Sequence, residues 1–86
     1  MQKEITIRKA DGVLNRDAAA LVQRAMRFDS EIYIEQGSKR VNAKSIMGVL
    51  SLNLKNGSTI ILSCKGDDEE DAIYDLKRLI DHGFVL

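Results

Sequence analysis

One hydroxyl in the 86-residue chain has a position from which it could carry phosphate. Ser45 directly precedes a short, mostly apolar segment and is expected to be the N-cap of a helix. Free backbone N–H groups and the helix dipole stabilise a phosphate at such a position. Ordinary helix capping explains the same pattern, so the residues alone leave both interpretations open.

A second candidate is the turn and helix start between Gly12 and Ala18. It brings Asn15 and Arg16 to a helix N-terminus, a kind of site that attracts anions. Asn15 is also a suitable N-cap, and Asp17 suits the positive end of the dipole. Capping is therefore the competing interpretation here as well.

The other reactive side chains predict no catalytic or metal site. The acids Asp67–Asp71 lack the alternating ligands and central glycine of a calcium loop, so we expect a solvated helix start. His82 follows Asp81, and adjacent helical residues do not face each other. The single cysteine, Cys64, excludes an internal disulfide and a multi-cysteine zinc site. We expect no catalytic residue, no metal and no cofactor.

Composition excludes several classes of protein. The chain has 13 basic and 13 acidic residues and no net charge, whereas nucleic-acid binding usually needs a basic excess. No apolar run approaches the ~20 residues that span a bilayer, and no secretory signal begins the sequence. We expect one cytoplasmic domain over residues 1–86, without direct nucleic-acid or membrane binding.

Hydrophobic periodicity predicts the elements that position these residues. The expected strands are 3–9, 31–35, 40–42 and 59–65, and the expected helices are 15–27, 45–52 and 67–83. The order β-α-β-β-α-β-α is typical of an α+β, two-layer sandwich with helices on one face of a four-stranded, largely antiparallel sheet.

The sequence pattern also predicts the facing and the ends of the three helices. The expected inward side chains of the first helix are Ala18, Leu21, Val22, Ala25 and Met26. The last helix is expected to begin at Asp67, with Glu70 completing a capping box. The middle helix is too short to bury all its apolar side chains, which are Ile46, Met47, Val49 and Leu50. We interpret the surplus as a candidate docking patch, a use that suits flexible Met47.

The run Lys-Arg-Val-Asn-Ala-Lys-Ser-Ile-Met-Gly-Val-Leu-Ser-Leu, residues 39–52, resembles the regulatory-serine region of the HPr family. HPr is the phosphocarrier of the bacterial sugar phosphotransferase system. The resemblance extends over residues 12–23, the Asn56-Gly57 turn and the acidic start of the last helix, so it covers nearly the whole chain. It implies the family's open-faced β-sandwich.

The same resemblance implies that the family's phosphohistidine chemistry is absent. The family motif is Gly, aliphatic, His, Ala, Arg, Pro, Ala, and this chain has Gly-Val-Leu-Asn-Arg-Asp-Ala from Gly12. Leu14 takes the histidine position and has no nucleophilic atom. Arg16 is retained, but in the family this arginine stabilises the phosphate on the histidine, which is absent in this chain. Asp17 takes the proline position and adds a negative charge near the path of an incoming phosphate.

Loss of the histidine with retention of Ser45 resembles the Crh group of HPr-like proteins. These are phosphorylated at that serine by the ATP-dependent HPr kinase/phosphorylase and then act as corepressors of a LacI-type catabolite control protein. Crh carries a polar residue in place of Leu14 and a proline in place of Asp17. The resemblance implies that Ser45 is the phosphoacceptor, with these contact residues for kinase or repressor: Arg16, Val22, Gln23, Ile46, Met47, Val49 and Leu50.

Two other functions stay open at this point. One is a phosphocarrier within the sugar transport chain, against which Leu14 argues strongly. The other is an interaction module that binds a different partner through the Met47 patch without phosphorylation. The sequence leaves the oligomeric state open, and a homodimer is compatible with it.

Overall fold

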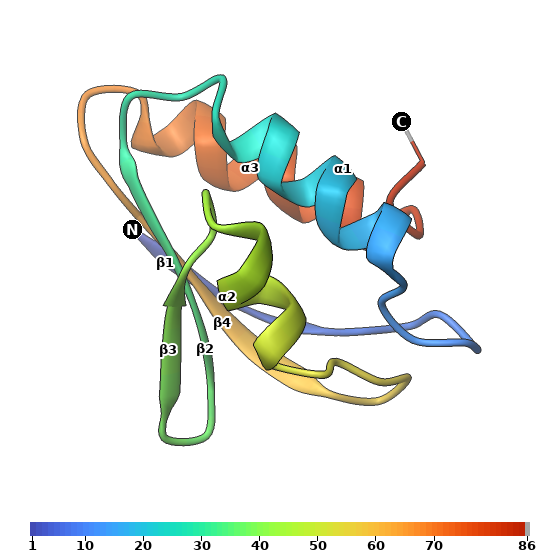
Figure 1. The fold of residues 1–86 in the computed structure, drawn as a ribbon. Helices are drawn as coiled ribbons and strands as arrows, with labels where there is room; N and C mark the ends of the chain where they lie inside the picture. The colour runs from blue at the N-terminus through green and yellow to red at the C-terminus, as the bar shows by residue number, and fades with distance from the viewer. Residues whose placement is uncertain (86) are drawn as a thin grey trace.

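The structure, a computed structural model, describes residues 1–85. Within them the elements are β1 (Gln2–Thr6), α1 (Asn15–Ala25), β2 (Glu31–Gln36), β3 (Lys39–Asn42), α2 (Ile46–Ser51), β4 (Thr59–Lys65) and α3 (Glu69–Asp81). The strands form one antiparallel sheet in the order β1-β4-β2-β3. All the helices cover the same face of this sheet, and the other face is open (Figure 1). The predicted α+β open-faced sandwich and the predicted element order are confirmed.

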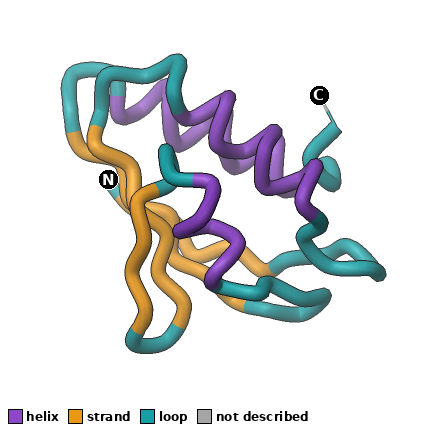
Figure 2. Tube along the Cα trace, in the orientation of Figure 1, coloured by secondary structure: helices purple, strands orange, loops and turns teal. Residues whose placement is uncertain are grey.

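The core lies between the sheet and the helices, which Figure 2 shows gathered on one side of the strands. Period-two alternation in β4 turns Ile60, Leu62 and Cys64 inward, and each of them is buried. Leu21 of α1 and Leu76 of α3 are buried from the helical side. The inward-facing residues of one sheet face and two helix stripes therefore form a single apolar cluster.

Truncation of a core side chain is expected to cost a large share of the stability. Leu21 and Ile60 are each 1% exposed, so Leu21→Ala or Ile60→Ala leaves a cavity and should lower the free energy of unfolding by ~2–5 kcal/mol. Thermal or urea unfolding measures this. Met26→Ala, which truncates a largely exposed side chain, is the control and should leave the midpoint nearly unchanged. Equal midpoints for wild type and Ile60→Ala would contradict the inward facing of β4.

The first helix differs from its prediction at both ends. Leu14, not Asn15, is the N-cap, because the Asp17 carboxylate accepts the Leu14 N–H at 2.8 Å and Asn15 is already helical. The helix ends at Ala25 rather than at Arg27. Met26 was expected to face inward, and this is wrong: the side chain is 64% exposed, since the chain turns away at the C-cap.

The last helix also begins later than predicted. Its N-cap is Asp68, and the expected capping box of Asp67 and Glu70 is wrong. The Asp68 carboxylate instead accepts the Asp29 N–H at 2.8 Å, the Ser30 N–H at 3.0 Å and the Ser30 hydroxyl. This side chain therefore ties the start of α3 to the loop before β2.

The first strand is shorter at its end than predicted, whereas the stop after the last helix lies where it was expected. The first strand ends at Thr6 rather than at residue 9, although Ile7 still donates to the Ser58 carbonyl at 2.8 Å and is buried. Gly83 has a φ of +69° just beyond α3, as expected of a helix stop. Among the described residues, no helix is both long and apolar enough to cross a membrane.

The contacts of Asp68 predict a loss of stability in acid. The Ser30 hydroxyl, followed by the Asp29 N–H, lowers the pKa of Asp68 below its ordinary value of 3.8. A carboxyl group with a lowered pKa in the folded state contributes stability above its unfolded pKa and loses it as the pH falls through the folded pKa. Asp68→Asn should therefore be less stable than wild type at pH 7. The difference should shrink as the pH falls from about 5 to below 4. Urea unfolding across this pH range tests it, and a difference that does not change with pH would contradict the assignment.

Candidate phosphorylation site and docking surface

Ser45 is the N-cap of α2, as predicted, in an extended backbone conformation with φ −113° and ψ 114°. Its Oγ accepts the Gly48 N–H at 3.1 Å. The side chain is half-buried, and its hydroxyl makes no other hydrogen bond among residues 1–85. The oxygen is therefore held by one hydrogen bond, while its proton has no acceptor among these described residues.

Two lysines fix the short helix that carries Ser45. Lys44 Nζ donates to the Phe28 carbonyl at 2.7 Å, which joins the start of α2 to the segment after α1. Lys39 Nζ donates to the Ser51 carbonyl at 2.8 Å, at the other end of α2. A six-residue helix has little stability of its own, so these contacts and its packing against α1 hold it in place.

We define the candidate docking surface, called the docking surface below, as Ile46, Met47 and the outer part of Leu50 on α2, with Arg16 and Gln23 on α1. Ile46 is 38% and Met47 74% exposed, which confirms that α2 leaves apolar surface uncovered. Leu50 is half-buried against the core. Arg16 and Gln23 are exposed on the helix that packs beside α2.

Two residues predicted as partner contacts do not belong to this surface. Val49 is 1% and Val22 7% exposed, so both side chains pack into the core rather than face a partner. Met26 was not predicted as a contact, yet its exposed side chain stands at the end of α1, two residues before the Phe28 carbonyl that binds Lys44. Its exposure could have been found only from the exact end of the helix.

Leu14, which the resemblance places at the histidine position, is half-buried and is the N-cap of α1. Asp17 is almost fully buried beneath it and accepts both the Leu14 N–H at 2.8 Å and, at 3.1 Å, the Lys9 ammonium. Contact with Asp11 and then with Asp17 raises the pKa of Lys9.

The Asp17 charge, expected near the path of an incoming phosphate, has partners within the protein. The charge is paired with Lys9, and the carboxylate itself uses an N–H group at the helix start. The Asp17 carboxylate thus occupies the N-terminus of α1 as an internal anion. A bound phosphate would have to compete with it for the N–H groups there.

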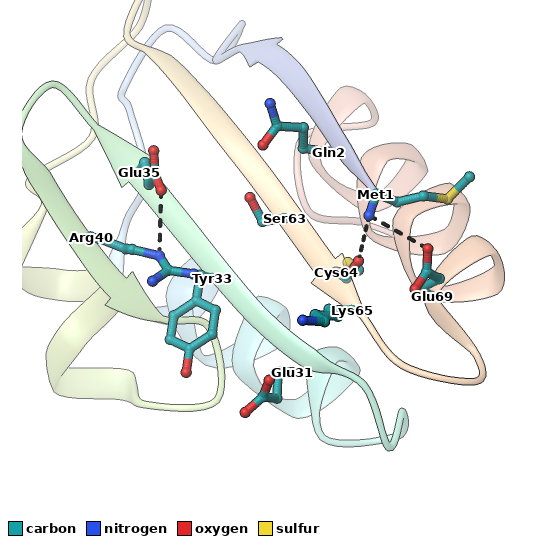
Figure 3. A pocket seen from close by; sticks show the side chains of 10 residues that line it. All are labelled: Met1, Gln2, Glu31, Tyr33, Glu35, Arg40, Ser63, Cys64, Lys65 and Glu69. Atoms are coloured by element: carbon teal, nitrogen blue, oxygen red, sulfur yellow. Dashed lines mark hydrogen bonds and ion pairs between the residues drawn. The ribbon is translucent and has the colours of Figure 1, made fainter.

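A depression of about 560 Å³, whose lining includes neither Ser45 nor Leu14, lies on the open face of the sheet (Figure 3). On one side Arg40 stacks on the Tyr33 ring at 4.0 Å and pairs with Glu35 at 3.4 Å. On the other side the Met1 amine donates to the Cys64 carbonyl at 2.9 Å. Burial raises the pKa of the Cys64 thiol to about 11, so this thiol is a poor nucleophile. The lining residues contain no nucleophile paired with a base.

His82 and the acidic residues Asp67–Asp71 are the other groups that could act in catalysis or bind a metal. Nδ1 of His82 lies 2.8 Å from the Arg78 carbonyl at the end of α3. In the part of the chain that the structure describes, no group of three His, Cys, Asp or Glu side chains is arranged to hold a metal ion. We therefore take Ser45, with exposed Ile46 and Met47 beside it, as the candidate functional site.

Both the sequence and the fold of this chain are similar to those of known proteins. A family model described as the PTS HPr component phosphorylation site matches residues 1–82. The chain is 46% identical over 81 residues to the HPr-like protein Crh of Halalkalibacterium halodurans, covering 94% of this chain and 96% of that protein. The crystal structure of HPr-C-His from Thermoanaerobacter tengcongensis superposes with a TM-score of 0.93 at 45% identity, covering 98% of this chain and 94% of that one. The crystal structure of Bacillus subtilis Crh, an intertwined dimer with a swapped domain, has a TM-score of 0.75 at 38% identity, covering 100% and 98%.

Proposed function

Because the chain belongs to the HPr family of the sugar phosphotransferase system, we propose that it is a regulatory, non-catalytic member whose Ser45 accepts phosphate from HPr kinase/phosphorylase. Its similarity to Crh proteins supports a regulator rather than a carrier. Leu14 adds to this support, since a hydrocarbon side chain cannot form a phosphoramidate.

The observation that carries the proposal is the placement of Ser45 at the start of a helix with an exposed apolar surface. Its Oγ is fixed by the Gly48 N–H, and Ile46 and Met47 are exposed on the helix that follows. In the reaction, Ser45 Oγ forms a bond to the γ-phosphorus of ATP and the bond to ADP breaks. The hydroxyl proton passes to a base of the kinase.

The phosphorylated protein would then act as a corepressor of a LacI-type catabolite control protein in the cytoplasm. The phosphate and the docking surface offer such a repressor a charge and an apolar contact together. A homodimer is compatible with this role, and the solved Crh dimer is the precedent within the family.

Incubation with ATP and HPr kinase/phosphorylase from the same organism tests the proposal. The intact mass is expected to rise by one phosphoryl group, and Ser45→Ala should abolish the rise. Ser51→Ala, which removes a hydroxyl at the other end of α2, is the control and should still be phosphorylated. An unchanged mass of the wild type, or modification of Ser45→Ala, would overturn the proposal.

A module that binds a partner without phosphorylation is the second candidate. The 74% exposure of Met47 favours it, because that surface is present in the unmodified protein.

A further inference from the structure

Gly48 lies between two side-chain hydrogen bonds within α2. Its N–H donates to Ser45 Oγ at 3.1 Å, and its carbonyl accepts the Ser51 hydroxyl at 2.6 Å. The first of these bonds is the one that fixes the orientation of the proposed phosphoacceptor.

The missing side chain of Gly48 is as important as its backbone. A Cβ at this position would lie 3.3 Å from Ser45 Oγ and 3.3 Å from Val41 Cβ of β3. Both contacts are tight, so the serine or the strand would have to give by a few tenths of an ångström. Glycine therefore allows α2 to approach β3 closely without pressing on the hydroxyl.

We propose that Gly48 is a positioning residue for phosphoryl transfer to Ser45, an inference that rests on the proposed function. The Gly48 N–H engages one lone pair of Ser45 Oγ, and the hydroxyl proton, which has no acceptor among residues 1–85, stays available to a base of the kinase. The absence of a Cβ keeps the space beside the attacking oxygen open. A methyl group there displaces the oxygen from the line of attack, and reaction rates fall steeply with such displacements.

The test compares Gly48→Ala with wild type in the reaction with ATP and HPr kinase/phosphorylase. We expect kcat to fall about tenfold, because the attacking oxygen moves by a fraction of an ångström. The KM for the protein should stay within about twofold, because Ile46 and Met47 remain exposed for docking. A merely structural role would not separate the two constants in this way.

Ser51→Ala is the matched control, since it removes the other hydrogen bond of Gly48 without placing an atom beside Ser45. Its kcat should stay within about twofold of wild type. The assay temperature is kept well below the thermal midpoint of each variant, so that unfolding does not lower the measured kcat. Alanine also favours a helix more than glycine does, which offsets the tight contact.

Each outcome decides a different claim. An unchanged kcat in Gly48→Ala, or an equal loss in Ser51→Ala, overturns the positioning role and leaves the proposed function intact. A wild-type protein that takes up no phosphate overturns both.

Discussion

Phosphoenolpyruvate and the first enzyme of the phosphotransferase chain are expected to leave this protein unphosphorylated. Leu14 has no nucleophilic atom, and His82 lies at the end of α3, on a different element from the carrier position. Acid-labile phosphate, measured by intact mass before and after mild acid, should therefore be absent. Its stable incorporation would contradict the assignment of Leu14 to the histidine position.

Restoring the histidine alone is expected to give little transfer. In Leu14→His the Asp17 carboxylate still uses the N–H of residue 14 and still occupies the helix start. The double variant Leu14→His/Asp17→Pro frees that donor, and proline is tolerated in the first helical turn. Because loss of one donor to a reacting oxyanion costs on the order of 10²-fold, the double variant should transfer about 10²-fold faster than Leu14→His.

Asp17→Pro by itself is the control and should remain inactive, since it supplies no nucleophile. Equal rates for Leu14→His and the double variant would show that Asp17 does not obstruct the reaction.

Local patterns in the sequence predicted the strands, the capping position of Ser45 and the exposure of α2. Ser45 was predictable because its own capping bond is local, from the Gly48 N–H three residues further on. The exposure of Ile46 and Met47 followed from the apolar content of a six-residue helix. The pattern did not show that Val49 is the residue that α2 buries, since this depends on how the helix sits over the core.

Contacts between distant segments account for most of what the sequence did not show. The pairing of Asp17 with Lys9 and the binding of Ser30 by Asp68 each join a helix start to another segment. The contacts of Asp68 account for the N-cap of α3 at Asp68 rather than Asp67, whereas the local bond from the Leu14 N–H to Asp17 accounts for the N-cap of α1 at Leu14. The positioning role proposed for Gly48 could not be predicted from the sequence, because it depends on how closely β3 approaches α2.

Phosphorylation of Ser45 is expected to strengthen binding to a LacI-type catabolite control protein. The phosphate adds about two negative charges at the start of α2, next to exposed Ile46 and Met47. Hydrogen bonds to charged groups contribute about 1.5–3 kcal/mol, so the affinity should rise at least about tenfold. Ser45→Ala should abolish the difference between kinase-treated and untreated protein.

Met47→Ala should weaken binding of the phosphorylated protein without blocking phosphorylation, because it removes the most exposed apolar side chain of α2. Tyr74→Ala is the matched control, since Tyr74 is 66% exposed but belongs to α3. Its affinity should equal that of wild type.

The most direct test of the corepressor role is a calorimetric titration of the repressor with unmodified protein and with protein phosphorylated at Ser45. A dissociation constant at least about tenfold lower for the phosphorylated form is the predicted result. Equal dissociation constants for the two forms would contradict the corepressor role and favour the interaction module that does not depend on phosphate.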